Sequence, residues 1–216
     1  MIVKESLSEQ IYHVLRSDLI EHKIEFGETL VNRSLQKRFN VSSTPVRDAL
    51  LRLKEDGIIE TITRSGAKII DYDYAIQVNQ LLMTITLGAI EYSLDMEAKP
   101  KILDNLRVYV KLQEENINTP TYYTYDYHFH KTFFDFSHNK LLKDIFKKYH
   151  LINEILVRAY HEDVLKQEKQ NCLKEHQEII KYIEKNDITT LLKIVKNHYL
   201  TAESIFKRIL VIHNKK

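Results

Sequence analysis

The stretch LVNRSLQKRFNVSSTPVRDALLRLKEDGIIE, residues 30–60, contains two short helical patterns separated by a tight connection. In the first pattern, Leu35 and Phe39 recur at the spacing of one helical face. Asn40 follows them, and asparagine tolerates the left-handed conformation in which many helices end. The first pattern therefore predicts a short helix that stops at Asn40.

The second pattern begins at the SSTP segment. Ser43 or Thr44 can cap the helix, Pro45 suits its first turn, and Gly57 ends it. The apolar residues of this pattern share one face, which we expect to be buried: Val46, Leu50 and Leu53.

The flanking segments complete a small domain. Ser6 and Glu9 have the spacing of a capping box, so a first helix is expected over residues 6–22. After Gly57, two β-branched runs surround a turn at residues 64–66, which predicts a hairpin. Three helices followed by a hairpin is the layout of a winged helix-turn-helix, in which the third helix enters the major groove of DNA.

The residues that such a domain would present to DNA are polar or basic. Residues 33–54 hold six basic side chains and one acidic one, although the whole chain carries a net charge of only +2. A local positive patch attracts phosphate. A small helical bundle with a solvated basic face is the alternative interpretation. The candidate contacts are the start of the third helix and one position on the second: Ser42, Ser43, Thr44, Arg47 and Arg33.

Beyond residue 73 the pattern changes to long helices. The chain has only four Gly and three Pro, which favours helices over a sheet with many turns. We therefore expect a mainly α protein with a DNA-binding domain at 1–72 and an all-helical domain at 73–216. The expected helices span about 74–98, 101–117, 121–136, 140–161, 165–185 and 188–212.

Several protein classes are disfavoured by composition. No apolar run approaches the length of a membrane span, and the N-terminus has no secretion signal. Cys172 is the only cysteine, so an internal disulfide and a cysteine zinc cluster are excluded. We expect a cytoplasmic protein without a membrane partner.

The segment TYYTYDYHFHKTFFDF, residues 121–136, combines aromatic residues with a polar pair. Asp126 and His130 are four residues apart, so on a helix they share a face and can bind one metal ion. His128, two residues from His130, faces elsewhere. The aromatic residues are interpreted first as helix packing.

Two further histidines lie on the last two expected helices. His176 and His198 are about equally far from the turn at Asn186 and Asp187, so an antiparallel hairpin would place them level. Together with Asp126 and His130 they would form a site of three histidines and one carboxylate. Each histidine could instead be an ordinary core residue.

The chain resembles a known family in both halves. Residues 30–60 with the later RSGAKI resemble the DNA-binding domain of GntR-type bacterial regulators. The segments DYHFHKTFFDFSHNKLL, EHQEIIKYIEKND and NHYL resemble the FCD ligand-binding domain of the FadR subgroup. With six expected helices in its second half, the chain resembles the VanR-like branch of this subgroup.

The resemblance implies a homodimeric regulator, expected to be a repressor, that binds an operator with two half-sites and responds to a small metabolite. It carries the family's DNA contacts onto Arg33, Ser42, Thr44, Arg47 and the wing residue Gly66. Its metal ligands fall on the four residues already selected: Asp126, His130, His176 and His198. Zinc or nickel, with a carboxylate effector on the open positions, is implied.

Two departures and two alternatives accompany this resemblance. Ser43 stands where the family usually has an arginine, and Thr86 and Leu87 lie near the usual position of an arginine that holds an acidic ligand. A metal-dependent enzyme could use the same histidine–aspartate set. A regulator with a metal-free ligand site is the other alternative.

Overall fold

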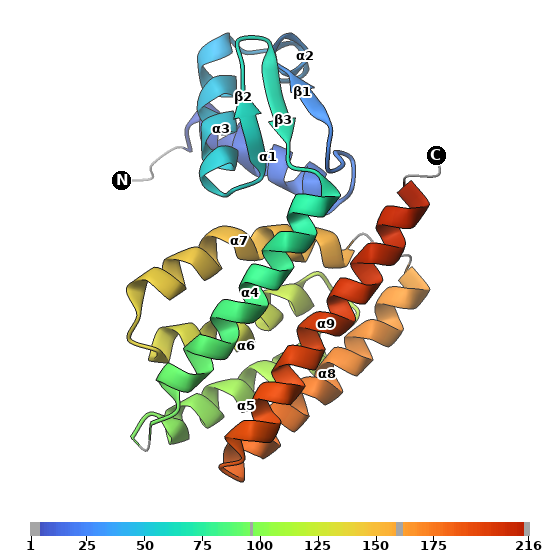
Figure 1. Cartoon of the computed structure of the whole chain (residues 1–216). Helices are drawn as coiled ribbons and strands as arrows, with labels where there is room; N and C mark the ends of the chain where they lie inside the picture. The colour runs from blue at the N-terminus through green and yellow to red at the C-terminus, as the bar shows by residue number, and fades with distance from the viewer. Residues whose placement is uncertain (1–4, 96, 159–161, 214–216) are drawn as a thin grey trace. The chain divides into compact units, whose positions relative to one another are not determined.

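The computed structural model describes residues 5–95, 97–158 and 162–213. In these residues the chain forms nine α-helices and three short β-strands (Figure 1). Contacts divide the chain into two compact units. The first contains the residues up to Ala75 and a segment that begins at Leu151, and the second contains the other helices.

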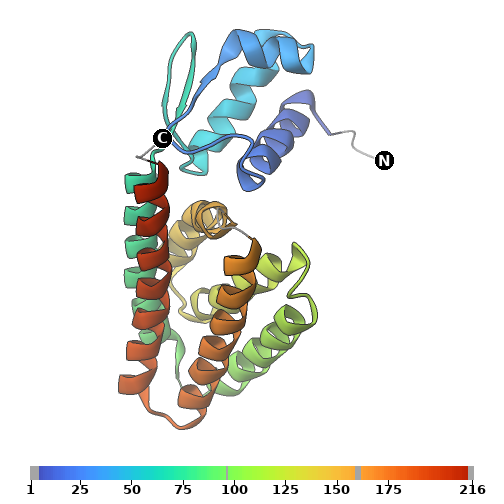
Figure 2. The same cartoon turned by 90° about the vertical axis from the view of Figure 1, so that its right-hand side faces the viewer.

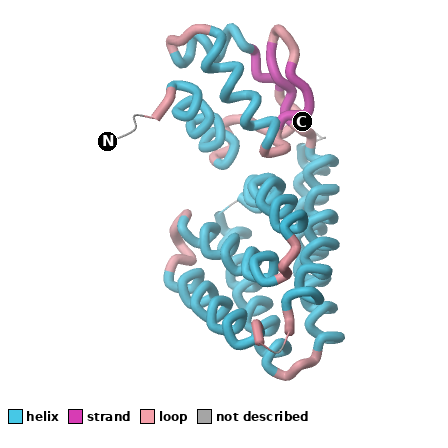
Figure 3. Tube along the Cα trace, turned by 90° about the vertical axis from the view of Figure 1, so that its left-hand side faces the viewer, coloured by secondary structure: helices cyan, strands magenta, loops and turns pink. Residues whose placement is uncertain are grey.

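The first unit is a winged helix-turn-helix, as predicted. A three-stranded antiparallel sheet, with strand order β1-β3-β2, accompanies its helices (Figure 3). The elements are α1 (Leu7–Ile20), β1 (Thr29–Val31), α2 (Asn32–Phe39), α3 (Ser43–Glu55), β2 (Ile59–Ile62) and β3 (Gly66–Ile69).

Local signals in the sequence set most of these boundaries. Ser6 and Glu9 form the predicted capping box at the start of α1. Asn40 ends α2 in the left-handed conformation, with φ 52° and ψ 48°. The predicted cap of α3 is wrong: the N-cap is Ser42, without a side-chain capping bond, and Ser43 is already helical.

The core of the first unit joins the three helices to the sheet. The apolar face predicted for α3 is buried against α1, and the start of the wing closes the core. Fully enclosed residues of this core include Leu15, Leu19, Leu50, Leu53 and Ile58, each with 0% exposure. Burying such a side chain stabilises the fold by about 1.5–3 kcal/mol. The opposite face of α3 does not contribute to this core, and it can carry polar residues.

Six helices contribute residues to the second unit, which starts at Ile76 and omits the segment from Leu151. They are α4 (Tyr72–Ser93), α5 (Lys99–Glu115), α6 (Thr121–Phe136), α7 (Lys140–Arg158), α8 (Glu162–Glu184) and α9 (Ile188–His213). Helices α8 and α9 form an antiparallel hairpin (Figure 2). Among the described helices, none combines the length and the apolar character that crossing a membrane requires.

The predicted helix spans agree with the bundle except at the end of α4. The prediction continued to residue 98, but α4 ends at Ser93. The carboxylate of Asp95 accepts a hydrogen bond from the Ala98 backbone N–H at 2.6 Å and prepares the start of α5 instead. The predicted spans 74–98 and 140–161 also include residues 96 and 159–161, which lie outside the described residues.

Candidate functional site

Three histidine rings meet inside the second unit. His130 on α6, His176 on α8 and His198 on α9 have ring centroids 5.1–5.2 Å from one another. His176 has 0% exposure and His130 6%. The hairpin therefore brings His176 and His198 to one level, as their equal distances from the turn predict, and α6 adds His130 to them.

The buried rings are uncharged. Burial, and after it the neighbouring imidazoles, lower the pKa values of His130 and His176 well below the ordinary value. Both rings are therefore neutral near pH 7, and each has one N–H donor and one nitrogen lone pair. A lone pair of this kind is what a divalent metal ion binds.

Gln113 on α5 fixes the orientation of His176. The amide nitrogen of Gln113 donates to Asp126 Oδ1 at 3.1 Å, and a carboxylate can only accept, so the amide oxygen must face His176. That oxygen lies 3.0 Å from His176 Nδ1, which must then carry the ring proton. The lone pair of His176 is consequently on Nε2, the nitrogen 3.9 Å from Asp126 Oδ1.

His198 is oriented by a neighbouring carboxylate. Its Nδ1 lies 2.6 Å from Glu175 Oε2, so Nδ1 donates to the carboxylate and Nε2 is the ring nitrogen that Glu175 leaves unengaged. Metal-binding histidines commonly have such a partner on the second nitrogen. Neither Glu175 nor Gln113 was predicted as part of the site, although Glu175 directly precedes His176 in the sequence.

Asp126 and Cys172 also lie next to His176. The Cys172 sulfur is 3.6 Å from His176 Nε2 and 3.7 Å from Asp126 Oδ1. Burial, and after it the charge of Asp126, raises the pKa of the Cys172 thiol well above its ordinary value. His176 therefore belongs to two groups of possible metal ligands. One group also contains His130 and His198, and the other also contains Asp126 and Cys172.

The cluster has aromatic and hydroxyl neighbours. Phe129 stacks on the ring of His176 at 3.8 Å between centroids. The ring of Tyr199 lies 5.8 Å from that of His130, and its hydroxyl hydrogen bonds to Thr86 at 2.9 Å. Thr86, at 0% exposure, therefore holds Tyr199 beside the site from α4.

His128 is not part of the cluster. Its ring stacks on Tyr109 at 5.3 Å, and its pKa is lowered by burial. The prediction that His128 faces away from His130 is confirmed.

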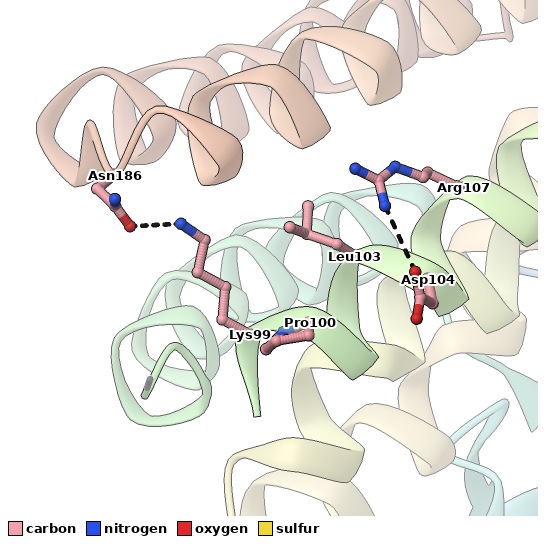
Figure 4. A pocket seen from close by; sticks show the side chains of 6 residues that line it. All are labelled: Lys99, Pro100, Leu103, Asp104, Arg107 and Asn186. Atoms are coloured by element: carbon pink, nitrogen blue, oxygen red, sulfur yellow. Dashed lines mark hydrogen bonds and ion pairs between the residues drawn. The ribbon is translucent and has the colours of Figure 1, made fainter. Parts of the chain in front are cut away.

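A surface groove lies at the turn of the α8–α9 hairpin (Figure 4). Its volume is about 370 Å³, and Lys99 and Arg107 of α5 line it. Lys99 donates to the side chain of Asn186, and Arg107 Nη2 donates to Glu184 at 2.7 Å. These contacts attach α5 to the turn of the hairpin.

The predicted DNA contacts lie in the first unit. The side chains of Ser42, Ser43, Thr44 and Arg47 are exposed at the start of α3, and Arg33 is exposed on α2. Arg38 pairs with Asp18 at 2.6 Å and Arg52 with Glu9 at 3.3 Å, so these two cations are partly neutralised. In the described part of the chain, Arg33 and Arg47 form no ion pair, which leaves their charge available for phosphate.

Gly66 has a structural role in the wing. It is buried, and a Cβ atom at this position would lie 2.2 Å from the carbonyl oxygen of Leu30. Only glycine therefore lets β3 approach β1. The exposed residues of the wing turn, Thr63, Arg64 and Ser65, precede it.

Comparison with known families agrees with both units. The model for gntR-family bacterial regulatory proteins matches residues 7–69, and the model for the FCD domain matches residues 77–201. The chain belongs to the GntR family and carries an FCD domain. Members of this family are DNA-binding transcription regulators and not enzymes.

Individual relatives point the same way. The chain is 28% identical over 202 residues to the HTH-type transcriptional regulator YdhC of Bacillus subtilis, covering 88% of this chain and 86% of YdhC. It is 38% identical over 61 residues to the HTH-type transcriptional repressor RspR of Escherichia coli, a match covering 28% of this chain and 27% of RspR.

Solved structures share the fold. E. coli McbR/YncC superposes with a TM-score of 0.68 at 15% identity and covers 96% of this chain and 100% of its own. Lar of Listeria monocytogenes superposes with a TM-score of 0.60 at 18% identity and covers 95% and 98%. At these identities the likeness shows the fold alone.

Proposed function

We propose that the protein is a metabolite-responsive repressor of transcription that acts as a homodimer in the cytoplasm. In this proposal residues 1–72 bind operator DNA, and residues 73–216 form the dimer and bind a divalent metal ion with a small carboxylate effector. The family matches support a DNA-binding regulator with an FCD domain. The metal ion, the effector and the repressor role are our additions.

The arrangement of His130, His176 and His198 is the observation that carries the metal site. Three imidazoles converge from three helices, and Gln113 and Glu175 hold Nδ1 of two of them, His176 and His198. A buried core histidine needs such a partner as well, so the convergence of three rings is what favours a metal site over helix packing. With the carboxylate of Asp126, the donor set suits zinc or nickel.

The residues present fit such an ion and define what each would do. Imidazole nitrogens of His130, His176 and His198 and a carboxylate oxygen of Asp126 would hold it. When bound, the ion supplies a Lewis-acidic position that attracts a carboxylate. Gln113 would keep both His176 and Asp126 in place, and Thr86 would keep Tyr199 against the metal-binding rings.

On the DNA side, the exposed start of α3 is proposed to enter the major groove. Arg47 and Arg33 would bind phosphate or base edges, and Ser42, Ser43 and Thr44 would lie near the bases. Gly66 contributes by holding the wing against the sheet. The serine at position 43 removes a common arginine contact, so we expect an operator preference of this chain's own.

The effector must bind one state of the dimer more tightly than another, because equal affinity for both states shifts nothing. A coupling of about 1–3 kcal/mol, which is usual for allosteric proteins, would change operator affinity about 5–150-fold.

The proposal is tested by selecting DNA ligands from a random duplex pool with the purified protein. We expect an enriched inverted repeat, because a two-fold dimer contacts two equivalent half-sites. Small carboxylates are then added in a mobility-shift assay, with and without a chelator. Release of the DNA by a carboxylate only in metal-loaded protein supports the proposal. No enriched sequence refutes DNA recognition, and a response unaffected by chelation refutes the metal's part in it.

A further inference from the structure

We propose that Cys172 is a fifth protein ligand of the metal ion, so that this chain adds a thiolate to the histidines and Asp126. This inference rests on the proposed metal site. It concerns a residue that the three-histidine, one-carboxylate set does not include.

The distances among three donor atoms carry the inference. Zn–S bonds of about 2.3 Å and Zn–N or Zn–O bonds of about 2.1 Å, at the angles of about 90–120° found in five- or six-coordinate ions, separate neighbouring ligand atoms by about 3.0–3.8 Å. In the structure, Cys172 Sγ lies 3.6 Å from His176 Nε2 and 3.7 Å from Asp126 Oδ1, and the last two atoms are 3.9 Å apart. The triangle is thus close to one face of a coordination shell.

The orientation of His176 supports the same conclusion. Gln113 occupies Nδ1, so the nitrogen that faces Cys172 is the one with the free lone pair. An ion bound to that lone pair lies on the same side of the ring as the sulfur. Cys172 precedes His176 by one helical turn on α8, so the helix itself keeps the two side chains together.

The alternative is a core thiol that only donates a weak hydrogen bond to Asp126. The two interpretations differ in chemistry. When a thiol binds a metal, the sulfur–metal bond replaces the sulfur–hydrogen bond and one proton leaves to solvent. The resulting thiolate is a soft ligand and favours zinc or cobalt over manganese or magnesium.

The composition of the chain makes the test unambiguous. Cys172 is the only cysteine among the 216 residues, so a thiolate-to-cobalt charge-transfer band can have no other source in this protein. The 216-residue protein is stripped of metal and titrated with Co²⁺ while the near-ultraviolet and visible spectra are recorded. We expect a charge-transfer band that saturates with the cobalt ligand-field bands. Cys172→Ser should bind Co²⁺ without that band.

Each outcome has a distinct meaning. Ligand-field bands without charge transfer in the wild type show that cobalt binds and that Cys172 is not a ligand, which overturns this inference and leaves the proposed metal site intact. No cobalt bands at all remove the proposed metal site and this inference with it. A charge-transfer band retained in Cys172→Ser overturns the assignment of the sulfur.

Metal preference supplies a second readout. In Cys172→Ser we expect the affinity for Zn²⁺ to fall by about tenfold or more relative to wild type, with a smaller change for Mn²⁺. Gln170→Ser, at an exposed position of α8, is the matched control and should leave both affinities unchanged. Equal losses for Zn²⁺ and Mn²⁺ in Cys172→Ser contradict a specific sulfur bond. Circular dichroism of the variants confirms that they fold.

Discussion

The amide of Gln113 offers a sharp test of how the histidine cluster is organised. In Gln113→Ala, His176 Nδ1 loses its acceptor and Asp126 Oδ1 loses a donor. Gln113 and His176 both have 0% exposure, so water does not readily replace the amide. We therefore expect the variant to lose both metal affinity and stability.

The size of each effect follows from the contacts. Removing the outer partner of a metal-binding histidine lowers affinity about 10–100-fold, or about 1.4–2.7 kcal/mol. Leaving the His176 N–H buried without an acceptor destabilises the metal-free fold by about 1–3 kcal/mol. Gln113→Glu keeps an oxygen for His176 but places a second carboxylate against Asp126, so it should lose affinity through charge repulsion at Asp126.

The assay is a zinc competition titration against a chromophoric chelator, with chemical denaturation of the metal-free protein alongside. Gln177→Ala is the matched control, because Gln177 is exposed and adjacent to His176 in the sequence. Its zinc affinity should equal that of wild type. If Gln113→Ala also binds zinc within about twofold of wild type, the amide does not organise the site and the tautomer argument for His176 is refuted.

The remaining predictions concern the first unit and the backbone. Arg47→Ala should weaken operator binding by about 1–3 kcal/mol per half-site and flatten its salt dependence, measured by mobility shift over a salt series; unchanged binding rules out α3 as the reading helix. Gly66→Ala should lower the free energy of unfolding by about 1–3 kcal/mol, because the new methyl group meets backbone at Leu30. In Gly88→Ala, the new methyl group on α4 has no neighbouring atom within 4 Å, so the free energy of unfolding should instead rise by about 0.5–1 kcal/mol. Denaturation curves in which both glycine variants change stability in the same direction contradict these steric assignments.

The histidine cluster was largely predictable because helices are rigid. His176 and His198 lie about equally far along α8 and α9 from one turn, so a fixed rise per residue makes them level. The four-residue repeat of a helix places Asp126 and His130 on one face of α6, but the structure puts them in different groups of candidate ligands, Asp126 with Cys172 and His130 with His198. These inferences need only the helix geometry and the antiparallel hairpin.

Gln113 and Cys172 show where such reasoning stops. Gln113 reaches the site from α5, and the rotation of that helix about its axis is set by packing, which no local pattern records. Cys172 was accessible in principle, since it is four residues from His176. Its direction towards Asp126 on α6 depends again on how two helices face each other.

In the first unit, too, local sequence signals predicted some features, whereas a feature that depends on distant contacts was not predicted. The capping box at Ser6 and the left-handed Asn40 are local signals and were predicted correctly. Strand β1 has only three residues, Thr29–Val31, and was not predicted. It exists because Gly66 lets β3 approach it, a contact between residues far apart in the chain.

Metal analysis of the purified protein beside His176→Ala is the most direct test of the proposed metal site. His176 belongs to both groups of candidate ligands, so its removal should abolish tight binding. After metal loading and dialysis, we expect one zinc or nickel ion per chain in wild type and close to none in a folded His176→Ala. A wild-type chain that retains no metal, or a variant that retains as much, would contradict it.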